Sequence, residues 1–299
     1  MTQQFKHGLL LAVFTYAVWG LFPLYFKLLA GMPADEIVVH RIIWSAFFTV
    51  VLLLAVQRLK GVRHSLCDIR LLGRLALSAM LLLANWLIFI YATLADDVLQ
   101  LSLGYYINPL FNMLFGFILF KERTHRMGII AIGLVFTGLA IQFAQVDKFP
   151  ILAVLVALVF SLYGVVRKGL KVDALTGLFI ETLILLIPGL IYLFCFTSQQ
   201  SITAIEHSYY WLIVLVLAGP ITSIPLITFS AAVTRIPYYL MGFCQYITPT
   251  MMFAFAIFLY HETWNRLDIV TFMFVWAGII CMVIGTWQAN KKPINLAGK

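Results

Sequence analysis

Ten long apolar segments follow one another through this sequence, and they constrain what the chain can fold into. The chain has 299 residues, of which 63% are hydrophobic and only 11% are charged. A soluble domain carries about 25% charged residues, so this much apolar surface must be solvated by lipid. About 20 apolar residues in a helix cross a bilayer. The sequence therefore predicts an all-α membrane protein with ten transmembrane helices, at 8–27, 37–56, 73–95, 98–120, 127–145, 149–166, 174–196, 210–233, 237–260 and 267–288.

The positive charges between these segments predict the orientation of the chain. Sixteen of the 20 Lys and Arg residues fall on one side of the predicted membrane. Loops rich in Lys and Arg stay in the cytoplasm, so we expect this side, with both termini, to be cytoplasmic. Only an even number of spans allows that. The residues are Lys6, Arg58, Lys60, Arg63, Arg70, Arg74, Lys121, Arg123, Arg126, Arg167, Lys168, Lys171, Arg235, Lys291, Lys292 and Lys299.

The net charge and the cysteines narrow the range of partners. The charge of +8 comes from short loops between apolar segments, where it sets orientation, so we expect no nucleic-acid partner. The four cysteines, Cys67, Cys195, Cys244 and Cys281, have no metal-binding spacing, and we expect neither a metal site nor a cofactor. The expected partners are the lipid bilayer and a small-molecule solute, with the protein a monomer or a homodimer.

The two halves of the sequence resemble each other. A shift of 140 residues aligns them without a gap across two predicted helices, and a shift of 141 places Lys27 on Lys168. With five helices in each copy, the second copy must be inverted in the membrane. Inverted repeats, here 1–146 and 147–299, are typical of secondary transporters. The 140 shift places Tyr106, Ile107, Pro109, Phe115, Glu122, Arg126 and Gly138 on Tyr246, Ile247, Pro249, Phe255, Glu262, Arg266 and Gly278.

Three clearly ionisable residues lie inside the predicted spans and away from their ends, namely His40, Arg41 and Glu181. A charge at a helix centre costs about 2.5–3.5 kcal/mol, so such residues face a cavity or a partner. We place His40 and Arg41 on the solute pathway. Glu181 is the candidate for proton coupling, because desolvation disfavours the charged form of a carboxyl group. The alternative is that Arg41 snorkels to the interface or pairs with Asp35 or Glu36 near the helix end.

Polar side chains mark one face of the predicted fourth helix. Tyr105, Asn108 and Asn112 are spaced at i, i+3 and i+7, and the repeat places Gln245 at the position of Tyr105. Polar groups are costly in lipid, so this face should point at a cavity or at another helix. Both readings, a solute pathway and interhelical hydrogen bonding, remain open.

Tryptophans deep in the spans add candidates for the same pathway. Trp19, Trp44 and the pair Asn85-Trp86 lie well inside their segments. Aromatic rings with a polar handle suit a pocket for a planar or amphipathic solute, although each Trp could equally be a packing residue.

Enzyme signatures are missing from the sequence. It contains no GxSxG, HExxH or Walker A motif, so we expect no catalytic residues and no ATP hydrolysis. Two alternatives to a transporter remain open. One is a membrane-embedded enzyme acting on a lipid-linked substrate, and the other is a receptor or assembly partner that transports nothing.

Several motifs together resemble the RarD branch of the EamA-type transporters, in the drug/metabolite transporter superfamily. One departure is Lys121, where the branch leads us to expect Gly before Glu122. The motifs are Pro33-Ala34-Asp35-Glu36-Ile37, His40-Arg41 with Trp44-Ser45, Asn85-Trp86, Leu103-Gly104-Tyr105-Tyr106-Ile107-Asn108-Pro109-Leu110, Glu122-Arg123, Tyr163-Gly164 with Arg167-Lys168, Thr176-Gly177 with Glu181-Thr182, and Gln245-Tyr246 with Pro249-Thr250.

The resemblance implies a ten-helix inverted repeat in the bacterial cytoplasmic (inner) membrane that exports metabolites or drugs, and it adds Tyr163 to the pathway. We expect the first to fourth and sixth to ninth helices to line a central cavity, with the fifth and tenth as scaffold. Alternating access would move amphipathic or amino-acid-like solutes, with protons as the expected coupling ion. The planar donors of Arg41 favour a solute with an anionic or strongly accepting group.

Overall fold

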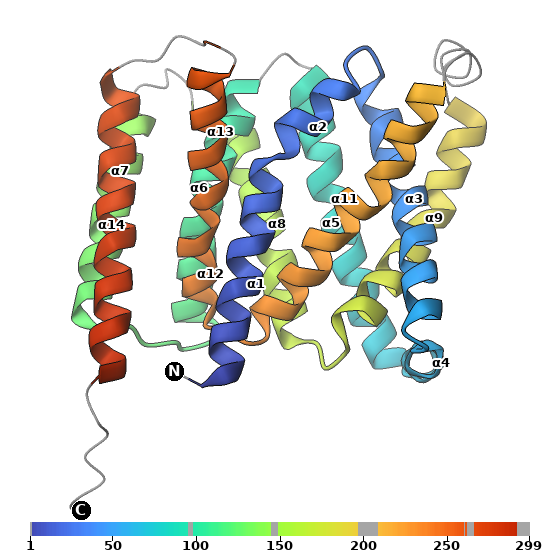
Figure 1. Cartoon of the computed structure of the whole chain (residues 1–299), viewed down its shortest axis with the longest axis horizontal. Coiled ribbons are helices and arrows are strands. Elements are labelled where there is room, and N and C mark those ends of the chain that lie inside the picture. The colour runs from blue at the N-terminus through green and yellow to red at the C-terminus, as the bar shows by residue number, and fades with distance from the viewer. Residues whose placement is uncertain are drawn as a thin grey trace, which may run out of the picture.

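In the computed structural model the chain is a bundle of helices (Figure 1). The structure describes residues 2–94, 98–144, 149–196, 209–259, 261 and 266–291, with the side chains of 89–94, 98–103 and 289–291 excepted. Glu262 and the end of the chain at 292–299 lie outside these residues. Within them there is no β-strand. The helices are α1 (Gln3–Gly20), α2 (Phe22–Leu28), α3 (Ala34–Ala55), α4 (Leu59–Cys67), α5 (Ile69–Leu94), α6 (Val98–Ile118), α7 (Arg126–Phe143), α8 (Ile151–Gly169), α9 (Ala174–Phe196), α11 (Tyr209–Val233), α12 (Tyr238–Gln245), α13 (Ile247–Phe258) and α14 (Arg266–Lys291).

Every predicted transmembrane segment is helical, as the apolar runs require. Nine helices or helix pairs among the described residues are long and apolar enough to cross a membrane. The remaining predicted span corresponds to α6, which has 21 residues and packs against α8 and α12. The protein is therefore a multi-pass membrane protein, and the count of ten spans stays a prediction.

Two of the predicted spans each consist of two shorter helices. The first divides at Leu21 into α1 and α2, and the ninth divides at Tyr246 into α12 and α13. Pro23 lies in the first turn of α2 and Pro249 in the first turn of α13, where a missing N–H costs nothing.

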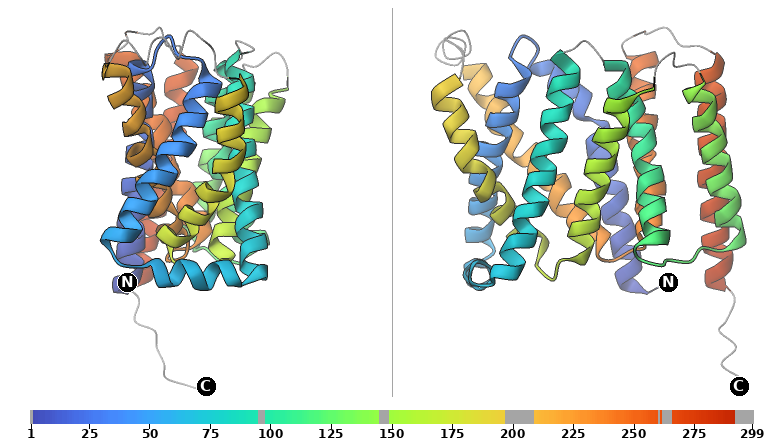
Figure 2. Two further views of the ribbon diagram at one scale, coloured as in Figure 1. Left: turned by 90° about the vertical axis from the view of Figure 1, so that its right-hand side faces the viewer. Right: turned by 180° about the vertical axis from the view of Figure 1, so that it is seen from behind.

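The first helix begins and the last helix ends at the same face of the bundle. α1 begins and α14 ends at the lower edge of Figure 1, and the view from behind in Figure 2 agrees. We call this edge the terminal face and the opposite edge the distal face. α4 lies across the terminal face in Figure 2, within the segment predicted to be a loop between the second and third spans. It is helical because Val62 is buried against Leu53 and Leu175.

α7 and α14 form a pair at one end of the molecule (Figure 1). Two glycines that the repeat aligns allow their backbones to approach. A Cβ atom on Gly138 would lie 3.0 Å from the carbonyl oxygen of Thr271, and one on Gly278 would lie 2.8 Å from that of Ala131. The contact is reciprocal, as expected for aligned positions of an inverted repeat; the repeat and the scaffold role of the fifth and tenth spans stay predictions.

The repeat is also visible in the backbone after α6 and α13. Lys121 and His261, which the 140 shift aligns, both adopt left-handed conformations, with φ of 51° and 53°. Residues with a Cβ atom rarely adopt this region. The two halves thus end the equivalent helices in the same way.

Candidate functional site

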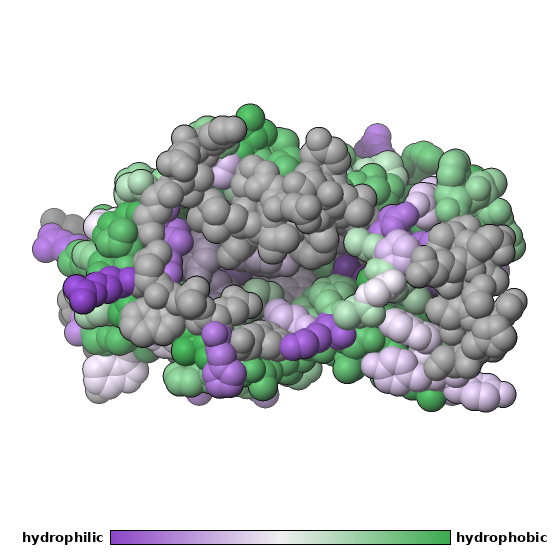
Figure 3. All heavy atoms as spheres, turned by 90° about the horizontal axis from the view of Figure 1, so that it is seen from above, coloured by the Kyte–Doolittle hydropathy of each residue, from purple (hydrophilic) through white to green (hydrophobic). Residues whose placement is uncertain are grey.

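A cavity of about 120 Å³ lies between helices of both halves. A single water needs about 10–15 Å³ of such space, so the cavity holds several water-sized groups. Seen from above, the distal face is hollowed near its middle (Figure 3). The described lining residues are Trp19, Phe22, Phe26, Arg41, Leu82, Asn85, Trp86, Gly104, Tyr105, Asn108, Val156, Ala157, Phe160, Thr222, Leu226, Gln245, Thr248 and Met252. None of them comes from α9, which corrects our expectation that the seventh span contributes.

Arg41 supplies the only charge among these described lining residues. It is 9% exposed, and its Nε donates to the hydroxyl of Thr222 at 3.0 Å. The guanidinium carbon lies 4.8 Å from the ring centre of Trp86, 5.6 Å from Phe26 and 5.9 Å from Phe22. Cation–π contacts of this kind contribute about 0.5–2 kcal/mol each, far less than a carboxylate partner would.

No carboxylate neutralises Arg41 within the described part of the chain. Asp35, one of the two partners considered from sequence, instead accepts a hydrogen bond from Tyr192. Arg41 forms no ion pair with Asp35 or Glu36. The guanidinium has five N–H donors, and among the described residues the one recorded acceptor for them is the hydroxyl of Thr222. A buried charge without a counterion is costly, and an anionic solute would relieve that cost.

Two asparagines of the cavity wall donate to backbone carbonyls of α8. The amide nitrogen of Asn85 lies 3.0 Å from the carbonyl oxygen of Val156, and that of Asn108 lies 2.7 Å from that of Ala157. A Cβ atom on Gly104 would lie 3.2 Å from the carbonyl oxygen of Ala153, so α6 packs directly on α8. These bonds fix the wall formed by α5, α6 and α8.

Side-chain amides close the cavity toward the terminal face. Asn112 donates to Gln245 at 2.6 Å, and Gln245 donates to Asn108. Asn108 and Gln245 line the cavity, whereas Asn112 lies one turn below it. Both sequence readings of the polar face thus apply, because Asn108 and Gln245 bond between helices and also face the cavity.

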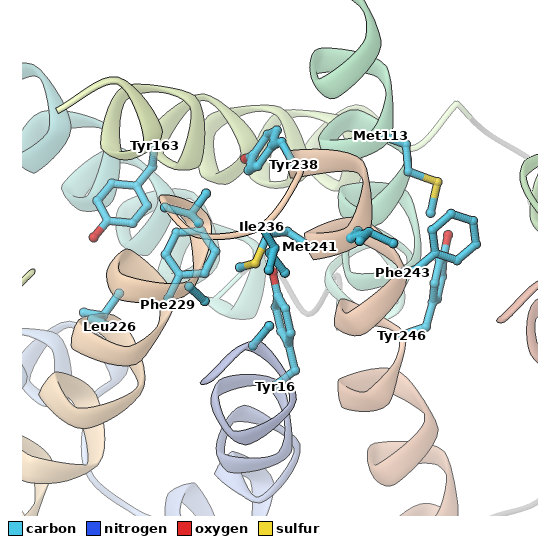
Figure 4. Packing of buried hydrophobic residues seen from close by; sticks show 14 of the residues in the cluster. Tyr16, Met113, Tyr163, Leu226, Phe229, Ile236, Tyr238, Met241, Phe243 and Tyr246 are labelled. Carbon is cyan, nitrogen blue, oxygen red and sulfur yellow. The ribbon is translucent and has the colours of Figure 1, made fainter. Parts of the chain in front are cut away.

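A cluster of buried aromatic and aliphatic residues joins α1, α8, α11 and α12 (Figure 4). Tyr16, Tyr163, Phe229, Tyr238 and Tyr246 are each fully buried. Tyr163 stacks on Phe229 with ring centres 5.9 Å apart, and the hydroxyl of Tyr238 donates to the carbonyl oxygen of Ser161 at 2.7 Å. We call these five residues the aromatic plug. The plug packs α1, α8, α11 and α12 against one another.

Glu181 lies beside the plug, outside the cavity lining. It is fully buried and accepts a hydrogen bond from Arg167 at 3.1 Å and one from Tyr163 at 3.4 Å. Arg167 also donates to Ser230 at 2.9 Å. The sequence reading ended the sixth span at residue 166 and left Arg167 in a loop. The helix continues to Gly169 instead, because Glu181 and Ser230 provide acceptors for a buried guanidinium.

Comparison with known proteins identifies the family to which this chain belongs. The sequence profile of the EamA-like transporter family matches residues 6–144. Protein RarD of Salmonella typhi is 40% identical over 290 residues, which cover 97% of this chain and 99% of the relative. The chain belongs to the RarD branch of the EamA-like transporter family. A Pseudomonas aeruginosa member named Chloramphenicol-sensitive protein RarD is 28% identical over 277 residues, covering 91% of this chain and 92% of that protein.

A solved crystal structure has the same fold. It superposes with a TM-score of 0.72 over 95% of this chain and 99% of the other, at 14% sequence identity. Identity this low shows the fold alone. The shared fold extends over both halves of the chain, beyond the first-half segment that the family profile matches.

The cavity brings together seven of the residues predicted for the pathway, which are Trp19, Arg41, Asn85, Trp86, Tyr105, Asn108 and Gln245. Five others lie elsewhere. Asn112, Tyr163 and Glu181 belong to the closed layers beneath the cavity, and half-buried His40 is not among its described lining. Trp44 packs against α11, where its backbone oxygen would lie 2.5 Å from a Cβ atom on Gly219.

Sequence reasoning missed Thr222 and three phenylalanines, Phe22, Phe26 and Phe160. Thr222 lies in a long apolar helix whose sequence has no polar periodicity, and the phenylalanines are among 25 in the chain. For Phe22, Phe26 and Thr222 the one available signal was a nearby proline in the same helix, whereas Phe160 had none. Among the described residues no group of three or more His, Cys, Asp or Glu is placed to hold a metal ion.

Proposed function

We propose that this protein is a secondary active transporter that carries a small organic solute through the cavity between its two halves by alternating access. The observation that carries the proposal is Arg41, a buried guanidinium whose free donors face an aromatic-lined cavity. A transporter needs a site that both sides can reach in turn, near the middle of the membrane. Arg41 gives that site a preference for an anionic or strongly accepting group.

The arrangement of closed and open layers supports alternating access. Figure 3 shows a hollow near the middle of the distal face. In this proposal the hollow leads to the cavity, and the side-chain amides and the aromatic plug close the path from the cavity to the terminal face. An inverted repeat can exchange these roles, because each half then adopts the conformation that the other had. In this proposal the present conformation is one of the two end states of the transport cycle.

Direction and coupling form part of the same proposal. We place the terminal face in the cytoplasm, so that the present conformation is outward-open. We further propose that the protein exports metabolites or drugs across the bacterial cytoplasmic membrane. Lys and Arg are concentrated in the loops of that face, as the positive-inside rule demands. Protons are the proposed coupling ion, with Glu181 as the coupling group. That role requires the Arg167–Glu181 pair to open during the transport cycle.

A transport assay on the purified full chain in proteoliposomes tests the proposal. Radiolabelled organic acids and chloramphenicol would be loaded on one side, with and without a pH gradient. We expect saturable movement that Arg41→Gln abolishes and Arg123→Gln, an exposed arginine of the terminal face, leaves intact. A receptor would bind solute without moving it, and a membrane-embedded enzyme would convert it; either result overturns the proposal.

Cys67 gives a test of the proposed topology. It is exposed at the end of α4, on the terminal face. In a variant whose other three cysteines are replaced by Ser, a membrane-impermeant maleimide should label Cys67 only after the cells are permeabilised. Labelling in intact cells would place the terminal face outside and reverse the proposed orientation.

A further inference from the structure

The charge balance of the cavity narrows the solute further. Arg41 contributes one positive charge, and no Asp or Glu is present among the described residues of the lining. The remaining polar groups of the wall, such as Asn85, Tyr105 and Thr222, are neutral. A cavity with this balance is complementary to a ligand of net charge −1.

An amino acid would bring a second cation into the same space. Its ammonium group is two bonds from the carboxylate carbon, so a carboxylate held by Arg41 puts the ammonium beside the guanidinium. Like charges at this separation repel strongly in a site of low dielectric constant. A carboxylate in the wall would offset that repulsion, but the described wall supplies only neutral acceptors, and two of its rings already face the guanidinium.

The neutral acceptors are also partly used by the protein. The hydroxyl of Thr222 accepts from Arg41 itself, and the side-chain oxygen of Asn108 accepts from both Gln245 and Asn112. An ammonium group has three donors that must all be satisfied once water is excluded. The cavity therefore discriminates against zwitterions as well as against free amines.

Rings surround the position where the organic part of the ligand would lie. Trp86 and Phe26 contact the guanidinium, while Trp19 packs edge-on against Phe160 with ring centres 5.4 Å apart. Leu82 and Met252 complete an apolar wall. Rings of this kind pack favourably on a flat apolar body. The cavity volume of about 120 Å³ gives room for roughly ten water-sized groups, comparable with one ring and a short acid chain.

We propose that the cavity is selective for aromatic monocarboxylates that lack an amino group, in preference to the corresponding amino acids. This rests on the proposed function and sharpens it, because amino-acid-like solutes were the expectation from sequence. Arg41 holds the carboxylate with two parallel hydrogen bonds, and the rings hold the aromatic body.

Four ligands that share one phenyl ring and a similar chain test the charge rule. They are phenylpropionate, an anion; phenylalanine, a zwitterion; phenylpropanamide, which is neutral; and phenethylamine, a cation. Isothermal titration calorimetry on the purified full chain should give a Kd for phenylpropionate at least tenfold lower than for phenylalanine, with phenethylamine the weakest. In Arg41→Gln the anion should lose its advantage over the amide, while Arg123→Gln should keep it.

If Arg41→Gln does not fold, the comparison of the four ligands on the wild-type protein still tests the proposal. Arg41→Lys then serves as a second variant, because it keeps the charge but lacks the planar guanidinium. Equal or tighter binding of phenylalanine would overturn the proposal, as would a failure of all four ligands to bind. Neither result touches the proposed function, which fails separately if phenylpropionate binds but no solute crosses proteoliposomes.

Discussion

The carboxylate of Glu122 lies 3.5 Å from the ammonium of Lys168, and this pair joins the two halves at the terminal face. Glu122 accepts from the backbone N–H groups of Tyr238 and Tyr239 at 2.7 and 3.0 Å, at the beginning of α12. Lys168 donates to the carbonyl oxygens of Val233 and Ile236, at the end of α11, at 3.0 and 2.8 Å. Each charge therefore caps the helix end of opposite polarity, and the pair holds the α11–α12 connection closed below the plug.

We predict that Glu122→Gln opens the terminal face more often. The amide keeps the shape but loses the ion pair and one charged acceptor, and hydrogen bonds to charged groups contribute roughly 1.5–3 kcal/mol each. Cys244, half-buried in α12 next to Gln245, reports the opening. Its alkylation from the terminal face, in a variant with Ser at the other cysteines, should become about tenfold faster, in line with that range.

A matched control lies on the same face. Arg58 pairs with Asp173 at 2.9 Å, but their side chains are 60% and 39% exposed. Exposed pairs contribute about 0–1 kcal/mol, so Arg58→Gln should leave alkylation of Cys244 nearly unchanged. If Glu122→Gln and Arg58→Gln behave alike, the Glu122–Lys168 pair does not hold the terminal face closed.

Lys121→Gly should stabilise the protein. Lys121 has a φ of 51°, a left-handed conformation that costs a residue with a Cβ atom about 1–2 kcal/mol and costs Gly almost nothing. After the greater chain entropy of unfolded Gly is subtracted, a gain of up to about 1 kcal/mol remains. Thermal unfolding in detergent would show it as a higher Tm. Lys121→Ala, which removes the charge but keeps the Cβ atom, should give no such gain, and an equal gain would assign the effect to the charge.

His125 makes the stability of α7 depend on pH. Its Nδ1 accepts from the backbone N–H of Gly128 at 2.9 Å, which caps the helix, and Nε2 lies 3.3 Å from the hydroxyl of Thr286. Burial lowers the pKa of His125 below its ordinary value of 6.5. The neutral ring therefore stabilises the fold above pH 6.5, and this contribution is lost as the pH falls through the lower folded-state pKa.

The expected loss on acidification is about 0.5–2 kcal/mol, the usual contribution of an N-cap. His125→Asn supplies a cap that does not titrate in this range, so its Tm should fall less between pH 7 and pH 5 than that of the parent. Identical pH slopes for the two proteins would contradict the assignment of this dependence to the cap.

Much of the fold could be predicted from sequence because helix length in a membrane follows directly from apolar length. The predicted span 174–196 coincides with α9, and the other spans differ at their ends by a few residues. The repeat was visible because proline, glycine and charged positions recur at one spacing. The breaks at Leu21 and Tyr246 were not predicted, because a proline near the start of a helix and one inside it look alike in sequence.

The site was predictable only in part, since partners are chosen by how helices cross. Arg41 was identified by the cost of a charge in an apolar run, which sequence shows directly. Its partner Thr222 lies 181 residues away and has no pattern that distinguishes it from other hydroxyls. Arg167 was wrongly assigned to a loop because the sequence does not show which residue it pairs with. A terminal arginine is read as a loop residue unless its buried acceptor, here Glu181, is already known to lie opposite.

The Arg167–Glu181 pair allows the coupling hypothesis to be separated from a structural role. Glu181→Gln should abolish transport driven by a pH gradient and leave solute exchange partly intact, because the amide cannot carry a proton. It also leaves the guanidinium of Arg167 buried without a counterion, which costs about 3–5 kcal/mol and could inactivate the protein for a different reason. The double variant Glu181→Gln with Arg167→Gln removes both charges and much of that cost. If Glu181 is the coupling group, the double variant regains thermal stability and exchange but still ignores the pH gradient. If the pair is only structural, gradient-driven transport returns together with stability, and the proton must be carried elsewhere.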